Sequence, residues 1–118
     1  MSNSSLDVMK AGLTLVNHTN IDKYKNQFAI AHGKVQSLKD NTLNLLIDQK
    51  NNHDLLITGF NKDIQAGEYI AIIGKVASDK SMEFLDMIQL DKDFDLDFVN
   101  EIIPLSSNQN TKNYFERN

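Results

Sequence analysis

The chain has 118 residues, of which 41% are hydrophobic and 24% are charged, with a formal net charge of −4 and no cysteine. This length is enough for one domain with one hydrophobic core, and the lack of cysteine excludes disulfides and thiolate metal sites. The acidic balance disfavours a free-standing nucleic-acid binder, because such proteins neutralise phosphates with an excess of Lys and Arg. No apolar run approaches the ~20 residues of a membrane span, and residues 1–5 do not read as a signal peptide.

The two ends of the chain differ in composition from its body. Residues 1–9 are small and polar and predict a flexible leader. Residues 10–16 predict a short turn or strand that caps the body, and residues 17–27 contain Asn and Asp where turns are favoured. Residues 106–118 predict a polar tail in which Tyr114 and Phe115 are the only large apolar side chains. We therefore expect the folded domain between residues 10 and 105.

Five segments between residues 28 and 90 alternate apolar and polar side chains, with the period of two that is typical of half-buried strands. Short runs rich in Asn, Asp and Lys separate most of them and predict tight turns. Leu43, Leu45 and Ile47 share one face of the second segment, and Leu55 and Ile57 share one face of the third. The expected strands are residues 28–37, 42–48, 53–60, 68–78 and 81–90.

Two of these strands nearly repeat each other: FAIAHGKVQS begins at Phe28, and YIAIIGKVAS begins at Tyr69. Each has an interior glycine, Gly33 or Gly74, and such glycines mark sharp bends or the close approach of another backbone. Five short antiparallel strands with these bends predict an all-β, five-stranded Greek-key barrel, the OB fold, because closure removes exposed strand edges. The first and fourth strands are neighbours in that fold. The two glycines are then matched bends in adjacent strands; a chance repeat of Gly-Lys is the alternative.

The apolar pattern changes to the helical period after Asp91. Asp95 predicts an N-cap, and the acidic side chains that follow it favour the positive end of the helix dipole. Pro104 predicts a stop or a kink, because proline cannot continue a helix without strain. The sequence therefore predicts one C-terminal α-helix over about residues 95–105.

The apolar side chains of this helix cover about half of its circumference when residues are projected at ~100° each. A helix that packs only on its own barrel needs an apolar stripe of little more than ~100°. The wide arc fits either deep packing in a groove of the barrel or additional packing on a helix of a partner. We predict a partner interface made of Leu96, Phe98, Val99, Ile102 and Ile103.

These features resemble the family of the small subunit of replication protein A, a heterotrimer that binds single-stranded DNA in eukaryotic nuclei. The resemblance spans about residues 11–105. It consists of Ala11-Gly12-Leu13 before the barrel, Gly-Lys-Val in the first strand and IAIIGKV in the fourth. Its most specific part is FDLDFVNE, which begins at Phe94 and opens the terminal helix.

The resemblance implies a non-catalytic nuclear subunit that joins a middle and a large OB-fold subunit through a bundle of C-terminal helices. Single-stranded DNA is then bound mainly by those partners. Related complexes at telomeres, some within telomerase, use a similar small subunit. The sequence therefore leaves open whether the complex serves general replication and repair or telomeres.

A second hypothesis is a free-standing OB-fold module that binds single-stranded DNA or RNA directly. Phe28 or Tyr69 could then stack on bases, and basic side chains could follow the phosphates. The candidate basic residues are Lys34, Lys39, Lys75 and Lys80. The connecting turns are short, and Asp40 and Asp79 adjoin two of these lysines. We therefore expect direct binding to be weak.

We expect no catalytic, cofactor or metal site. The Gly-Lys pairs at residues 33–34 and 74–75 lack the upstream glycine and the following Ser or Thr of a phosphate-binding loop. The three histidines have no metal-ligand spacing. Residues 91–95 begin like a calcium loop, but Leu96 stands where glycine is required and Ile102 where the bidentate glutamate belongs.

Overall fold

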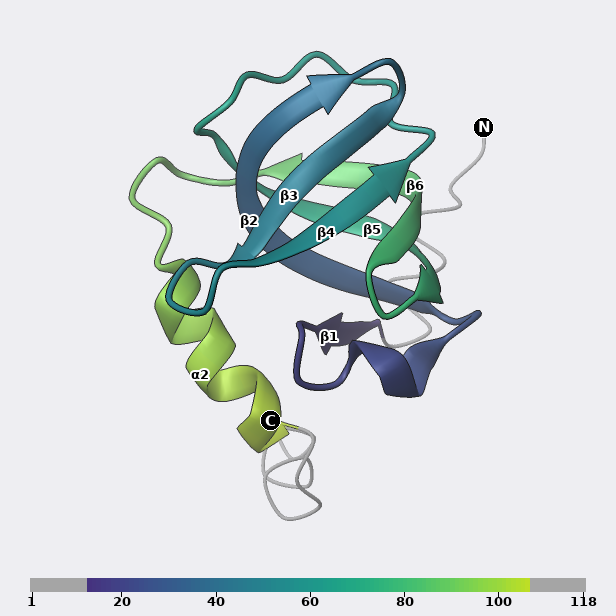
Figure 1. Cartoon of the computed structure of the whole chain (residues 1–118). Helices are drawn as coiled ribbons and strands as arrows, with labels where there is room; N and C mark the ends of the chain where they lie inside the picture. Colours follow the sequence, from purple (N-terminus) through teal and green to yellow (C-terminus); the bar gives the residue numbers. More distant parts are fainter. Residues whose placement is uncertain (1–12, 107–118) are drawn as a thin grey trace.

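The computed structural model describes residues 13–106, which form a closed barrel of strands with one helix beneath it (Figure 1). The expected leader lies outside these residues, and so does the expected tail beyond Ser106. In chain order the elements are β1 (Thr14–Val16), the short 3-10 helix η1 (Ile21–Tyr24), β2 (Phe28–Lys39), β3 (Thr42–Asp48), β4 (His53–Thr58), β5 (Tyr69–Ser78), β6 (Ser81–Gln89) and α2 (Leu96–Ser106).

The barrel closes because β2 pairs with β5 along its first half and with β3 along its second half. Around the ring the order is β2, β3, β4, β6 and β5, which confirms the five-stranded OB fold and the pairing of the first and fourth expected strands. One pair of the ring, β4 with β6, is parallel rather than antiparallel. The chain runs through β5 between these two strands, and the tight turn after β5 brings β6 back in the same direction as β4. Thr14–Val16 adds β1 to β2 as a further parallel strand.

Gly33 and Gly74 lie where neighbouring strands come too close for any side chain. A Cβ atom on Gly33 would lie 2.6 Å from Cγ of Leu45 and 2.6 Å from the carbonyl oxygen of Leu46. A Cβ atom on Gly74 would lie 2.2 Å from the carbonyl oxygen of Glu83. Because β2 and β5 are antiparallel, the two glycines are not opposite each other in the ladder. Gly33 directly precedes the residue at which β2 pairs with both β5 and β3, where the strand changes partners.

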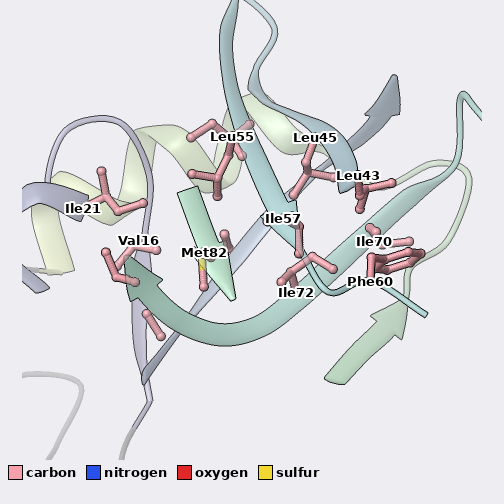
Figure 2. Close-up of a cluster of buried hydrophobic side chains, with 14 of the residues drawn as sticks. Val16, Ile21, Leu43, Leu45, Leu55, Ile57, Phe60, Ile70, Ile72 and Met82 are labelled. Atoms are coloured by element: carbon pink, nitrogen blue, oxygen red, sulfur yellow. The ribbon is translucent and has the colours of Figure 1, made fainter. Parts of the chain in front are cut away.

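The hydrophobic core fills the barrel with side chains from every strand (Figure 2). The expected inward faces of the second and third strands are fully buried, as is Phe60 after β4. Phe84 meets the Phe60 ring edge-on, with the ring centroids 4.9 Å apart. Ile21 of η1 is also buried and covers the core from outside the strands, although its segment reads in the sequence as polar turns.

The terminal helix begins as the sequence predicts and ends later. The backbone N–H of Phe98 donates to Oδ1 of Asp95 at 3.0 Å, which confirms Asp95 as the N-cap. Pro104 lies inside α2, which runs on to Ser106, one residue beyond the predicted end, so the helix does not stop at the proline. The proline ring disturbs the turn that precedes it, and the residues after it can retain helical angles.

Candidate partner-binding helix

The segment before α2 is held against the barrel by stacked rings. The Phe94 ring lies 5.5 Å from the imidazole of His32 on β2, with 9° between the two planes. Its centroid is also 6.0 Å from the ring of Tyr69 at the start of β5. These contacts bury aromatic surface and fix the point from which the helix departs.

The middle of α2 is tied to the barrel by Asn100. Its Nδ2 donates to the carbonyl oxygen of Ile47 on β3 at 2.7 Å, and its Oδ1 accepts from Nδ2 of Asn17 at 2.8 Å. One side chain therefore joins α2, β3 and the segment after β1. Figure 1 shows α2 in this position, below the barrel and beside β1 and the β3–β4 turn.

Asn17 and Asn20 form the support for this contact, and both are buried. Oδ1 of Asn20 accepts the backbone N–H of Asn17 at 2.9 Å, and its Nδ2 donates to the carbonyl oxygen of Leu15 at 3.0 Å. Oδ1 of Asn17 accepts the N–H of Thr19 at 2.8 Å. Sequence reasoning missed this network, because three separated asparagines read as turn and surface residues. The one sequence signal for this network was Asn100, which belongs to the Asn-Glu pair of the segment that resembles the family.

We expect Asn100→Ala to lower the free energy of unfolding by about 2 kcal/mol, because it leaves the buried amide of Asn17 and the Ile47 carbonyl without their partner. Equilibrium urea unfolding of the whole chain measures the change. Glu101→Ala on the next residue is the matched control. The Glu101 carboxylate is exposed and pairs with Nζ of the exposed Lys50 at 3.7 Å, so its loss should cost less than about 0.5 kcal/mol. Equal effects of the two substitutions would contradict a structural role for Asn100.

The five residues predicted to bind a partner lie on different faces of α2. Leu96 and Ile103 are each 1% exposed and are buried within this chain. Val99 and Ile102 are half-buried, between the buried and the exposed faces of α2, whereas Phe98 is 56% exposed. Leu105, which is outside the predicted set, is 58% exposed. Phe98 and Leu105 are seven residues apart, close to two turns, so they share one face with Ile102 between them.

A second feature beside the helix is a pair of stacked histidines. The rings of His18 and His53 lie 4.1 Å apart with 14° between their planes, and Nδ1 of His18 is 3.2 Å from Oδ2 of the buried Asp48. They line a pocket of about 500 Å³ that also contains Asp22, Asp54, Asp79 and Lys80. Among the described residues no group of three or more His, Cys, Asp or Glu could hold a metal ion.

The stability of the protein should decrease as the pH falls below about 6.5, the ordinary histidine pKa. Burial lowers the pKa of His32. Burial and the neighbouring His53 also lower the pKa of His18, and Asp48 offsets this only in part. The unfolded chain therefore binds more protons than the folded one in this window, so protonation favours unfolding.

Urea unfolding between about pH 7.5 and pH 5 measures this dependence. His32→Phe keeps a ring against Phe94 and removes one titrating group, so its profile should be flatter. The carboxylate of Asp48 acts at lower pH: burial raises its pKa, but hydrogen bonds from Asn51 and Lys50 and the nearby His18 hold the pKa below its ordinary value. Its contribution is lost only in stronger acid. Stability that rises on acidification to pH 5 would contradict the prediction.

The four candidate DNA-contacting lysines do not converge on one groove. Lys75 pairs with Phe28 at one end of the β2–β5 ladder and Lys34 pairs with Tyr69 at the other, six residues away. That separation is about 20 Å along the strands. Nζ of Lys34 lies 5.8 Å from the Tyr69 ring centroid. Lys39 ends β2, and Lys80 lies in the β5–β6 turn beside the acidic side chains of the histidine pocket.

The barrel topology, with a helix at one end, defines an OB-fold domain. A family model described as Replication factor A protein 3 matches residues 9–112. The chain therefore belongs to the family of this small replication factor A subunit, as its residues predicted. Members of the family are non-catalytic subunits, which confirms that the chain is not an enzyme. A comparison with curated protein sequences gave no match.

Solved structures similar to this chain include chains of two kinds of complex. A chain of U. maydis replication protein A bound to single-stranded DNA is 22% identical with a TM-score of 0.66, covering 80% of this chain and 89% of that one. The S. pombe telomere capping protein Ten1 is 20% identical with a TM-score of 0.65, covering 80% and 96%. A chain of the S. pombe Stn1–Ten1 complex is 21% identical with a TM-score of 0.64, covering 80% and 90%. No helix in the described part of the chain is long and apolar enough to cross a membrane.

Proposed function

We propose that this chain is the small subunit of a heterotrimeric single-stranded DNA-binding complex, either a replication protein A or its telomeric counterpart. Its role is assembly: α2 packs with helices of a middle and a large OB-fold subunit. The observation that carries this proposal is the division of α2 into two faces. Leu96 and Ile103 are buried within the chain, whereas Phe98 and Leu105 remain exposed.

Family membership and the likeness to chains of both kinds of complex support this role. It implies a nuclear protein that acts in replication, repair or telomere maintenance. Affinity purification of the tagged full chain from its own cells, with identification of the co-purifying chains, tests the proposal. Two OB-fold subunits of one complex are the expected result. Their identity decides between the general and the telomeric complex, and recovery of the chain alone would overturn the proposal.

The alternative function is a free-standing module that binds single-stranded DNA or RNA itself. The scattered lysines and the net charge of −4 argue against it, since phosphate neutralisation supplies most of the affinity of such proteins. We expect the isolated chain to bind labelled single-stranded oligonucleotides no tighter than about 10 μM at moderate salt. Fluorescence anisotropy measures this. Submicromolar binding would favour the alternative.

A further inference from the structure

The net charge of this protein is concentrated at the helix that carries the exposed apolar face. Residues 91–105 contain five acidic side chains and one lysine, a formal charge of −4. The other 103 residues contain eleven acidic and eleven basic side chains and are neutral overall. The negative potential of the protein is therefore strongest near α2, where it attracts positively charged groups that approach this helix.

The acidic residues lie at one end of the apolar face. Asp91, Asp93 and Asp95 are all exposed and precede the first turn of α2. Oδ1 of Asp95 accepts the N–H of Phe98, so Asp95, the last residue of the acidic segment, belongs to the same turn as the exposed Phe98. At the other end, exposed Leu105 lies in a last turn that has no basic residue. The face of α2 that carries Phe98, Ile102 and Leu105 is thus apolar, with exposed acidic side chains at its N-terminal end.

The acidity exceeds what helix stability requires. A helix N-terminus carries roughly half a positive charge, which one or two carboxylates offset. Asp95 already supplies the cap, and Asp97 lies in the first turn. The side chains of Asp91 and Asp93 are both exposed. Oδ1 of Asp91 accepts the backbone N–H of Asp93 at 3.1 Å, and the two carboxylates remain accessible to an approaching basic side chain.

We propose, resting on the assembly role given above, that the occupant of this face is a basic amphipathic helix of a partner subunit. Its apolar side chains cover Phe98 and Leu105, and its Lys or Arg side chains lie beside Asp91, Asp93 and Asp95. A second copy of this chain is disfavoured, because it would bring another segment of charge −4 to the same place. A nucleic acid is disfavoured by the same sign of charge.

The charges should act mainly on the rate of association. Complementary charge steers two surfaces together and raises the association rate at low salt, whereas apolar contacts determine how slowly the complex dissociates. Salt screens the exposed carboxylates over a distance of about 8 Å at physiological ionic strength. The charge and the apolar face therefore have separable kinetic signatures.

The test uses two synthetic helical peptides with one shared apolar stripe, flanked by Lys in the first and by Glu in the second. Stopped-flow fluorescence measures the binding of each to the full chain. We expect the basic peptide to associate roughly tenfold faster at about 50 mM salt, and this preference to disappear near about 0.5 M salt. Replacing Asp91, Asp93 and Asp95 with Asn should also remove the preference for the basic peptide. Asn at position 95 keeps an Oδ1 atom that can cap the helix.

The matched control replaces Asp40, Asp63 and Asp79 with Asn. All three are exposed and lie in loops of the barrel, so the net charge changes equally in a different place. This variant should keep the preference for the basic peptide; if it loses the preference as fully as the first variant, the effect belongs to net charge and the proposal fails.

Phe98→Ser separates this inference from the assembly role. Equal association rates for the two peptides, with binding lost on Phe98→Ser, would contradict the proposal that the partner helix is basic. That outcome would still support an apolar interface on α2. Binding of the basic peptide that Phe98→Ser does not weaken would be adsorption to the acidic segment, and it would overturn both. Failure of the basic peptide to bind at all would contradict the proposal that a basic amphipathic helix occupies this face.

Discussion

The double substitution Phe98→Asp and Leu105→Asp should abolish association with the partner subunits while leaving the barrel folded. Both side chains are more than half exposed, so their replacement removes little of the chain's own core. Exposed apolar residues that become buried at the centre of an interface contribute roughly 2 kcal/mol or more each. Their loss should weaken binding by about a thousandfold. Co-purification of the tagged variant with its partners, followed by quantification of each chain, measures the effect.

Leu38→Asp is the control for this substitution. Leu38 lies near the end of β2 and is 39% exposed, so it is another accessible apolar side chain far along the chain from α2. Its replacement should leave the complex intact. Circular dichroism and urea unfolding of each variant confirm that the barrel is folded. Full retention of partners by the Phe98 and Leu105 variant would exclude this face of α2 as the interface.

Gly74→Ala should destabilise the protein by about 3 kcal/mol, even though alanine adds a single methyl group. The new Cβ would lie 2.2 Å from the Glu83 carbonyl oxygen, well inside van der Waals contact. That oxygen belongs to β6, which pairs with β5 along most of its length, so it cannot move without disturbing the ladder. The midpoint of thermal unfolding should fall by roughly 10–15 °C.

Gly59→Ala separates this steric effect from the general effect of losing a glycine. Gly59 has a positive φ of 73°, and within the described residues no atom beyond its own chain neighbours lies within 4 Å of an added Cβ. Alanine there should cost only about 1 kcal/mol, from the left-handed backbone conformation. If Gly59→Ala proved as damaging as Gly74→Ala, the close approach of β6 to Gly74 would not be the reason for the loss of stability.

The strand positions and the closing pair of the barrel could be predicted because they follow from local patterns. Alternation of apolar side chains identified all five strands of the ring, with every strand end within two residues of its observed position. The interior glycines indicated sharp bends or close backbone approach, as in a small barrel, and the OB fold predicted from these strands makes the first and fourth strands neighbours. Asp95 was identifiable as the cap because the N-cap position selects short polar side chains.

The parallel pairing of β4 with β6 and the burial of Ile21 could not be read from the sequence. Neither leaves a local signature: pairing direction depends on where the chain returns, and one isoleucine among polar residues shows no period. Burial of Asn17 and Asn20 was equally hidden. A buried amide is tolerable only when its hydrogen-bond partners are supplied by the folded chain.

The sequence by itself determined the kind of protein: a closed five-stranded barrel followed by one helix whose apolar side chains cover about half of its circumference. Only the tertiary structure decided which part of that surface stays exposed. Leu96 and Ile103 are covered and Phe98 and Leu105 are not, because Asn100 bonds to Ile47 and Asn17 and so sets the rotation of α2 on the barrel. Those contacts join residues 53 and 83 positions apart, a separation at which no pattern along the chain reports on them.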